Sequence, residues 1–219
     1  MILAIDYGEA RCGLALGQTI PAKAWVCKTS HALKTCLEQP VDRYIVGMPL
    51  SMSGRYSSQT FLSIAFAECL WKKSEKDVIL VDERLTSKMF SGRKGRDALS
   101  AVEIFKSFVE GAIHYKLRLP TKINDSLITF ISKKQKCKVL VVNVSDVRVV
   151  SKCSQCVVVQ KDPYYAYLFH KMGCHVERDL KRLKKSEMFD IIVTDHHTPE
   201  LNDFVESEEN IFCACSSKG

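Results

Sequence analysis

The chain has 219 residues, 46% of them hydrophobic, and a formal net charge of +7. This length and composition exclude a disordered chain and allow one large domain or two small ones. The positive charge suits a polyanionic partner such as a nucleic acid, although many basic proteins bind none. No apolar run reaches the length that spans a membrane, so we expect no membrane association.

The N-terminus and the cysteines bear on the cellular compartment. An acidic residue, Asp6, comes early in the chain and no basic segment precedes it, so we expect no signal peptide. The 10 cysteines are scattered through apparent strands and helices. Without an export signal they are best interpreted as reduced, mostly buried thiols, and the protein is expected to be cytoplasmic.

Strand and helix signals alternate through residues 1–119. Short apolar runs at 1–6, 13–17 and 21–27 predict an antiparallel meander. The signals that follow predict a helix at about 31–39, a strand at 43–46, a helix at 57–73, a strand at 78–82 and a helix at about 97–117. This order predicts a mixed sheet flanked by helices.

The character of the chain changes near residue 121, where we place a domain boundary. Residues 120–138 include a basic run and are expected to form a solvated linker. Strands are predicted at 139–144, 156–160, 174–177, 189–194 and 210–214, with helices at about 164–172 and 178–185. Residues 139–219 are therefore expected to form a second, smaller α/β domain.

Three acids, Asp6, Glu83 and Asp97, lie where an apolar segment meets a glycine-rich or basic one. Asp6 and Glu83 follow predicted strands and Asp97 begins a predicted helix, so the carboxylates can meet at one edge of the sheet. Carboxylate oxygens favour Mg²⁺ or Mn²⁺, and cations held in this way promote phosphodiester hydrolysis. Taken singly, each acid also fits an ordinary role in a turn, on the surface or as a helix N-cap.

Glycine and arginine residues follow the first acid. Gly8 and Gly13 allow the backbone to approach a phosphate closely. Arg11 lies between them and suits phosphate oxygens, although an ion pair with Glu9 or with an acid across the sheet is the alternative. This segment is therefore a candidate for contact with a nucleic-acid backbone.

More basic residues surround the second and third acids. Arg84 is expected either to orient the carboxylate of Glu83 or to bind the scissile phosphate. The segment 91–96 is short and contains glycine, and it is either a phosphate-binding loop or a solvated connector. Its candidate phosphate contacts are Arg93, Lys94 and Arg96.

Four segments occur in a fixed order: Asp6-x-Gly8-x-x-Arg11-x-Gly13-x-Ala15, then VGMPLSMSG at 46–54, DERLTS at 82–87 and DALSA at 97–101. With them, residues 1–119 resemble the YqgF family of RNase H-fold proteins, relatives of the RuvC resolvases. The resemblance implies a five-stranded mixed sheet with Asp6, Glu83 and Asp97 as catalytic metal ligands. It also implies a nuclease that trims the 5′ end of precursor 16S ribosomal RNA, with Holliday junction resolution as the older proposal.

The chain departs from the family pattern in two places. Ser51 and Ser53 stand where the family usually has asparagine and aspartate, which alters polar contacts in that loop. The segment 87–96, before Asp97, is shorter than in the family. The position of Asp97 therefore decides between a nuclease and a catalytically weak nucleic-acid-binding or ribosome-binding protein.

The second half of the chain carries a weaker resemblance. The segments GCHVE at 173–177 and FDIIVTDHHTP at 189–199 resemble a truncated response-regulator receiver domain, a Rossmann-type unit in which Asp195 matches the phosphoacceptor. The paired metal-binding acids of receivers fall on Gln160 and Lys161, so Asp195 is expected to be vestigial. A DHH phosphoesterase is a competing resemblance, but its upstream aspartate motifs are not found.

A zinc site is the remaining alternative in this half. Cys153-x-x-Cys156 could combine with Cys174 and His175, but Cys213-x-Cys215 has the wrong spacing for a ribbon or knuckle. Small buried thiols are therefore expected.

The sequence as a whole predicts a metal-dependent nuclease acting on structured RNA, with precursor ribosomal RNA as substrate and ribosomal precursor particles as partners. A resolvase-like nuclease for branched DNA is the first alternative, because both substrates are recognised largely through phosphate and shape. A nucleic-acid-binding protein with a regulatory pseudo-receiver is the second. A monomer and a homodimer are both compatible with the sequence.

Overall fold

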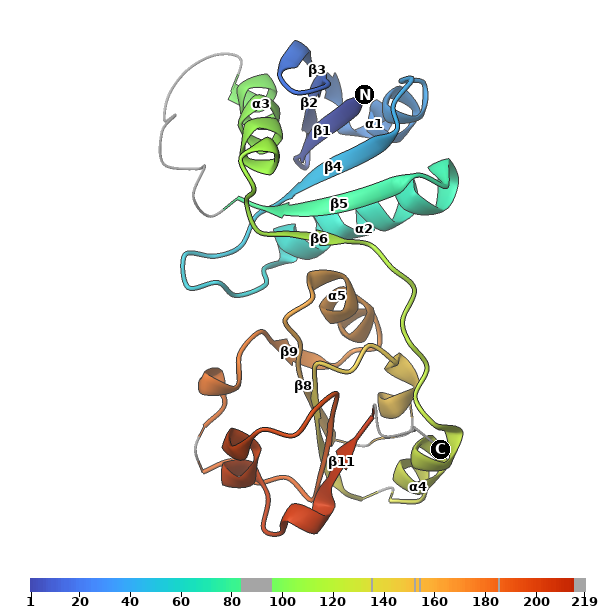
Figure 1. Cartoon of the computed structure of the whole chain (residues 1–219), viewed down its shortest axis with the longest axis vertical. Helices are drawn as coiled ribbons and strands as arrows, with labels where there is room; N and C mark the ends of the chain where they lie inside the picture. Colours follow the sequence, from blue (N-terminus) through green and yellow to red (C-terminus); the bar gives the residue numbers. More distant parts are fainter. Residues whose placement is uncertain (84–95, 135, 152, 154, 185, 215–219) are drawn as a thin grey trace. The chain divides into compact units, whose positions relative to one another are not determined.

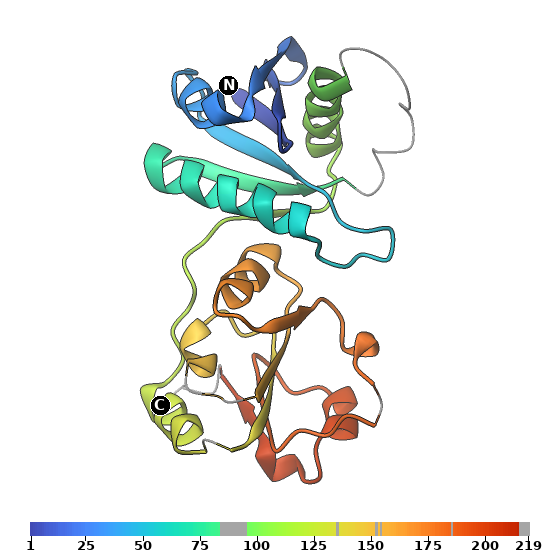
Figure 2. The same cartoon turned by 180° about the vertical axis from the view of Figure 1, so that it is seen from behind.

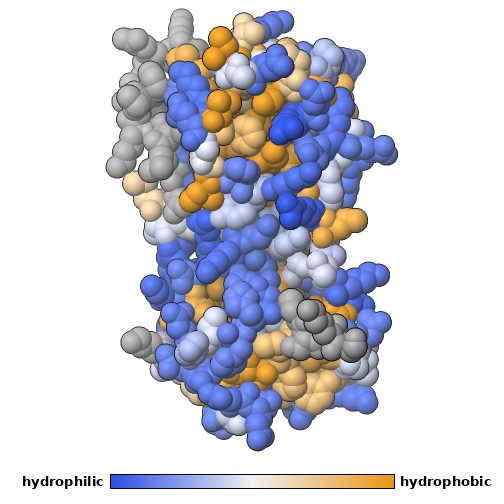
Figure 3. All heavy atoms as spheres, in the orientation of Figure 1, coloured by the Kyte–Doolittle hydropathy of each residue, from blue (hydrophilic) through white to orange (hydrophobic). Residues whose placement is uncertain are grey.

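The computed structural model describes residues 1–83, 96–134, 136–151, 153, 155–184 and 186–214 (Figures 1, 2 and 3). The chain divides into two compact units, Met1–Arg118 and Leu119–Gly219. In the described part of the chain no helix is long and apolar enough to cross a membrane.

The first unit is built on a six-stranded mixed sheet in the order β3-β2-β1-β4-β5-β6. The strands are β1 (Ile2–Tyr7), β2 (Arg11–Gly17), β3 (Pro21–Lys28), β4 (Arg43–Met48), β5 (Asp77–Asp82) and β6 (His114–Lys116). Strands β1 to β3 form an antiparallel meander, β4 and β5 run parallel to β1, and β6 is antiparallel. The predicted meander and the following βα alternation are confirmed.

Helices cover both faces of this sheet. Helix α3 (Arg96–Val109) packs on the face that presents Ala4, Ala15, Ile45 and Val81, through its own Ala101, Ile104 and Phe105. Side chains alternate between the faces of a strand, so the fully buried Leu3 and Ile5 belong to the opposite face. Helix α2 (Ser58–Ser74) contacts β4 and β5, and α1 (Thr29–Leu37) contacts α2 and β3.

The sheet has a sixth strand, and α3 is shorter than predicted. The helix was expected to continue to residue 117, but it ends at Val109, and Gly111 follows with a φ of +86°. Glycine adopts this left-handed conformation without the steric cost that a side chain imposes, and it commonly ends helices. The amides of Gly111 and Ala112 bond back to Phe108 and Ser107, and the chain then pairs with β5 as β6.

The second unit contains a five-stranded parallel sheet in the order β11-β10-β7-β8-β9. Its strands are β7 (Lys138–Val142), β8 (Gln155–Val159), β9 (His175–Glu177), β10 (Ile191–Thr194) and β11 (Ile211–Cys213). Helices α4 (Asp125–Lys133) and α5 (Pro163–Lys171) accompany four 3₁₀ turns, η1 (Val147–Val150), η2 (Leu180–Arg182), η3 (Pro199–Phe204) and η4 (Glu208–Asn210). The predicted helix at 178–185 is only the short turn η2.

The strand order corrects the receiver interpretation. The first strand of the unit, β7, lies at the centre, with β8 and β9 on one side and β10 and β11 on the other. Numbered within the unit this is the order 3-2-1-4-5 of Rossmann-type sheets, whereas receivers have the order 2-1-3-4-5. The Rossmann-type α/β class is therefore right and the receiver-like topology is wrong. Asp195 follows β10, the fourth strand, instead of the third strand that carries a receiver's phosphoacceptor.

Strand β7 is buried on both faces. Val139 and Val141 belong to one apolar cluster, which also contains Phe169 of α5. Leu140 and Val142 belong to a second cluster with Ile192 of β10. A parallel strand covered on both sides needs apolar residues at every position, which explains the continuous β-branched run.

An ion pair between the buried Asp146 and the partly exposed Arg148 fixes the connection after β7. Asp146 is 4% exposed, and its carboxylate accepts bonds from the amide of Ile123 at 3.0 Å and from Nε and Nη2 of Arg148 at 3.0 and 2.7 Å. Burial acts to raise the pKa of Asp146, but the hydrogen bonds from Arg148 and from the backbone outweigh it and hold the pKa below its usual value. The charged form of Asp146 thus stabilises this unit.

We predict that Asp146→Ala lowers the free energy of unfolding by about 2 kcal/mol, because the Ile123 amide and Arg148 lose their partner. The contribution is present above the ordinary pKa of the carboxyl group and is lost as the pH falls through the lowered pKa of the folded state. Urea unfolding at neutral and acidic pH, with amide exchange at Ile123, measures it. Exposed Asp203→Asn is the control, and an equal loss at pH 3 and pH 7 would contradict the pH dependence.

Candidate functional site

The candidate site lies at the edge of the first sheet where the parallel strands β4 and β5 end. Two residues beyond Ala4, on the same face of β1, stands Asp6. On the adjacent antiparallel strand β2, Asp6 is paired with Gly13, which lies two residues before Ala15 in the sequence. On the face of the sheet beneath α3, the next pair of residues after the apolar Ala4 and Ala15 is therefore an acid and a glycine, Asp6 and Gly13.

Asp6 is held by α3. The hydroxyl of Ser100 donates a hydrogen bond to the carboxylate of Asp6. Partial burial raises the pKa of Asp6, the bond from Ser100 lowers it, and the charge of Asp97 raises it again, with a net shift upward. Asp97, in the first turn of α3, thus acts electrostatically on Asp6.

Glu83 continues the line of β5. Its amide donates to the carbonyl of Met48 at 3.3 Å, and its Oε1 is buried. Burial is the main cause that raises the pKa of Glu83 to about 8, and the charges of Asp6 and Asp82 raise it further. Desolvation and repulsion by the neighbouring carboxylates therefore favour the protonated form of Glu83.

Two glycines make this arrangement possible. A Cβ at Gly47 would come closer than 3.0 Å to Oε1 of Glu83 and to Cδ1 of Ile104. A Cβ at Gly13 would come closer than 3.0 Å to the backbone oxygen of Asp97. Gly13 therefore admits the first turn of α3, and Gly47 leaves room for the side chain of Glu83.

The turn between β1 and β2 explains another predicted residue. A Cβ at Gly8 would lie 2.7 Å from the carbonyl oxygen of Arg11, to which the amide of Gly8 donates at 3.1 Å. The side chain of Arg11 is exposed at the start of β2. Its alternative role, an ion pair with Glu9, is not found among the described residues. Arg11 is thus accessible to an external anion.

The structure brings the three predicted acids together around Asp6, which interacts with Glu83 and with Asp97. Oxygen donors of this kind suit a hard divalent cation. Within the described ranges, however, no group of three or more His, Cys, Asp or Glu is close enough together to hold a metal ion as the side chains stand. The carboxylate oxygens suit such an ion. The interactions that the structure shows are two pairs, Asp6 with Glu83 and Asp6 with Asp97.

Several predicted residues lie outside the described part of the chain. Arg84, Arg93 and Lys94 belong to the segment 84–95, and the side chain of Arg96 is also not described. Ser51 and Ser53 are described: their hydroxyls lie 3.0 Å apart, and the amide of Arg55 donates to Oγ of Ser51 at 2.8 Å. The two serines therefore bond within their own loop.

The cysteines form no metal site among the described residues. The nine cysteines that the structure describes are free thiols, but only Cys12 and Cys36 are buried. The expectation that most would be buried is wrong, because the cysteines of the second unit lie at the margin of an apolar cluster. Cys156 and Cys174 are hydrogen-bonded to each other there.

Sequence reasoning missed Ser100 and Gly47 as parts of the site. Ser100 lies one helical turn after Asp97, so both face the same side of α3. Gly47 lies two residues beyond the core residue Ile45. Both stand inside segments that were noted in the sequence, and helical and strand periodicity were the signals that could have found them.

Comparison with known proteins identifies the family of this chain. A family model described as "RuvX: Holliday junction resolvase" matches residues 1–110. A protein of Thermotoga maritima is 34% identical over 215 residues, which cover 97% of this chain and 94% of the relative. The chain belongs to the RuvX family. The resemblance to YqgF proteins is thereby confirmed.

Two further similar proteins each match about half of the chain. A protein of Alcanivorax borkumensis is 34% identical over 128 residues, which cover 51% of this chain and 96% of the relative. This relative and the Thermotoga maritima protein share the name "Putative pre-16S rRNA nuclease". A solved RuvC structure of Thermus thermophilus matches with 10% identity and a TM-score of 0.33, covering 53% of this chain and 99% of that chain. That TM-score is too low to establish a shared fold by itself.

The absence of a side chain at Gly47, next to the carboxylate of Glu83, leads to a first prediction for the site. Gly47→Ala places a methyl group against the carboxylate of Glu83 and against Ile104, so we expect a loss of about 1–3 kcal/mol in the free energy of unfolding. Chemical denaturation measures it. The double variant Gly47→Ala, Glu83→Ala should lose less than the sum of the single variants, because one of the two clashes is removed. Additive losses would contradict the contact.

The raised pKa of Glu83 leads to a second prediction. Between pH 4.5 and about 8 the unfolded chain has released this proton while the folded chain retains it, so the stability of the first unit falls as the pH rises. Glu83→Gln removes this dependence. In metal-free buffer we expect the variant to come close to the wild type near pH 5 and to exceed it by roughly 3–4 kcal/mol near pH 8.

Thermal melts across this pH range, with chelator present, test the second prediction. Glu110→Gln, which changes an exposed carboxylate just after α3, is the matched control and should follow the wild type. Parallel stability curves for the wild type and Glu83→Gln would show that Glu83 ionises normally in the folded chain.

Proposed function

We propose that this RuvX-family chain is a metal-dependent nuclease that hydrolyses phosphodiester bonds in structured RNA. The observation that carries the proposal is the electrostatic contact of Asp6, at the end of β1, with Glu83, just after β5, and with Asp97 of α3. Clustered carboxylates destabilise the folded chain when no cation is bound, and burial increases this loss of folding free energy. A site that binds divalent metal and phosphate accounts for this gathering of partly buried acids better than a purely structural role does, because a bound cation would offset their mutual repulsion.

The proposed ligands are Asp6, Glu83 and Asp97, with Mg²⁺ or Mn²⁺ as the ion. When bound by these residues, such an ion would supply Lewis-acid polarisation of the phosphate and a water of lowered pKa. The chain contributes the remaining elements. Ser100 orients the carboxylate of Asp6, Gly47 admits that of Glu83, and the exposed Arg11 holds a phosphate oxygen of the substrate.

The proposed substrate is precursor 16S ribosomal RNA, cleaved at its 5′ end in the cytoplasm, with ribosomal precursor particles as partners. The name of the two relatives supports this choice, and the relative from Thermotoga maritima matches along both units. The description of the family model supports branched DNA as the second candidate. The net charge of +7 suits either polyanion and does not separate them.

We predict that Asp6→Asn lowers the rate of divalent-dependent cleavage of precursor 16S RNA by more than about 100-fold, since it removes a ligand charge. Ser100→Ala should lower the rate by roughly 10–100-fold, the range for a residue that orients a ligand. Asp77→Asn, at the opposite end of β5, is the control and should cleave at the wild-type rate. A four-way DNA junction under the same conditions tests the second candidate.

Metal binding gives a readout that does not depend on activity. Mn²⁺ should raise the melting temperature of the wild type and of Asp77→Asn, while the shift should shrink in Asp6→Asn. Cleavage by Asp6→Asn at the wild-type rate would refute the assignment of Asp6. Salt-sensitive RNA binding without cleavage by the wild type would instead indicate the catalytically weak binding protein.

A further inference from the structure

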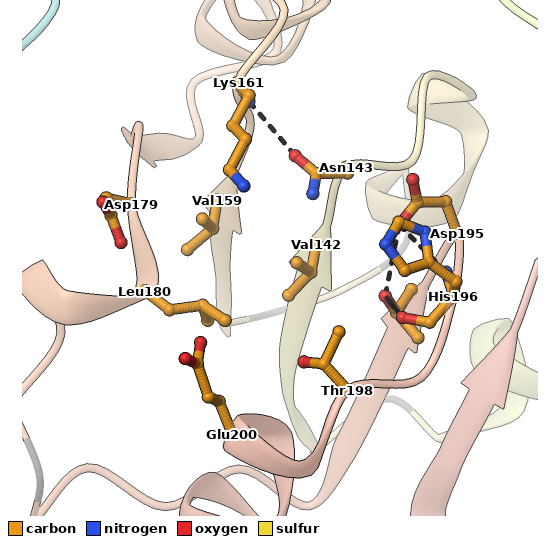
Figure 4. Close-up of a pocket in the computed structure, with 11 residues that line it drawn as sticks. Val142, Asn143, Val159, Lys161, Asp179, Leu180, Asp195, His196, Thr198 and Glu200 are labelled. Carbon is orange, nitrogen blue, oxygen red and sulfur yellow. Dashed lines mark hydrogen bonds and ion pairs between the residues drawn. The ribbon is translucent and has the colours of Figure 1, made fainter.

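The second unit has a polar pocket at the carboxyl ends of its parallel strands (Figure 4). The pocket has a volume of about 90 Å³ and opens beside the ends of β7, β8 and β10. Val142, Val159 and Leu180 supply its apolar surface, and polar side chains surround them. Nothing in the proposed nuclease chemistry of the first unit uses this pocket.

The topology places this pocket where a parallel sheet offers a ligand site. The chain leaves β7 toward β8 and β9 on one side, and β10 and β11 lie on the other side of β7. In open parallel sheets, ligands bind outside the carboxyl ends of the strands where the order reverses in this way. Asn143 follows β7 and Asp195 follows β10, and both line the pocket. The location alone therefore predicts a ligand.

The charges around the pocket restrict the ligand. Asp179, Asp195 and Glu200 line it, whereas Lys161 and His196 are the basic lining residues. Three carboxylates disfavour a free phosphate or a pyrophosphate, which need an excess of positive charge or a glycine-rich turn. Residues 143–149, which follow the first strand of this unit, contain no glycine. The lining favours a ligand that donates hydrogen bonds from uncharged hydroxyl groups.

Asp195 is arranged to accept such a bond. Its Oδ1 accepts from the backbone amide of His196 at 2.9 Å and pairs with Nδ1 of the same residue at 3.1 Å. Its Oδ2 has no hydrogen-bond partner among the described residues, and neither has the hydroxyl of Thr198. The side chain of Asp195 is 30% exposed, so a ligand can reach it. One carboxylate oxygen is thus fixed by the protein while the other is available.

The size of the pocket limits the ligand to a small group. A volume of about 90 Å³ excludes a whole dinucleotide, and the polar and apolar lining then decides which small group fits. A ribose combines ring carbons, which suit the apolar surface of Val142 and Val159, with hydroxyl donors, which suit Asp195. We propose that this pocket binds the ribose of an RNA strand and that Asp195 accepts the hydrogen bond of the 2′-hydroxyl group.

This inference deepens the proposed function and rests on its RNA substrate. The 2′-hydroxyl group is the chemical feature that separates RNA from DNA at a given nucleotide. A site that reads it would give the chain a preference for RNA that contacts with phosphates cannot supply. Asp195, expected from the sequence to be a vestigial phosphoacceptor, then has a present role in recognition.

Binding of the full chain to matched strands tests the proposal. The strands are an RNA of the precursor 16S 5′ region, its 2′-O-methyl form and the DNA of the same sequence, measured in chelator so that no cleavage occurs. We expect the wild type to bind the RNA about tenfold more tightly than the other two strands. Asp195→Asn and Thr198→Val should each remove most of this ratio, while exposed Asp203→Asn should keep it.

The charge change makes the result diagnostic. Asp195→Asn removes a negative charge, so simple electrostatics would strengthen binding to RNA and to DNA alike and leave the ratio unchanged. A wild type that binds the RNA and DNA equally, or an Asp195→Asn variant with the wild-type ratio, would overturn the proposal. Failure of the nuclease is distinguishable, because Asp6→Asn should lose cleavage and retain the RNA preference.

Discussion

The close packing of α3 on the sheet is the constraint on which the candidate site depends. Two glycines, Gly13 and Gly47, face the helix from β2 and β4, and a Cβ at either position would collide with its surroundings. Because of these gaps, the first turn of α3 brings Asp97 and Ser100 next to Asp6. A bulkier residue at Gly13 would push the helix outward and separate the acids, even though no acid would be changed.

The site is a continuation of the core by one step of the strand repeat. The apolar residues under α3 are Ala4, Ala15, Ile45 and Val81. The residues two positions away from them, toward the same edge of the sheet, are Asp6, Gly13, Gly47 and Glu83. The same alternation that buries the apolar row therefore buries the carboxylates. Burial explains why the pKa of Asp6 and that of Glu83 are both raised. Functional sites commonly carry such a cost in stability.

Sequence periodicity predicted much of the first unit and less of the second. The meander, the βα alternation and the convergence of Asp6 with Glu83 followed from apolar runs and from the parallel direction of β4 and β5. The end of α3 was missed because Gly111 was not weighed as a helix terminator. The strand order of the second unit could not be predicted, because five apolar strands look alike in sequence and only tertiary packing decides which of them are neighbours.

The residues that sequence reasoning missed share a physical cause. Ser100 and Gly47 carry no chemistry of their own, so a search for titratable or charged groups passes over them. Their importance appears only when the distance between α3 and the sheet is known. The pocket beside Asp195 was missed for a related reason, since its carboxylates come from separate elements whose proximity depends on the strand order. In both units the carboxyl ends of parallel strands gather acids, and what differs is the element that adds to them: α3 supplies Asp97 in the first unit, whereas η3 supplies Glu200 in the second.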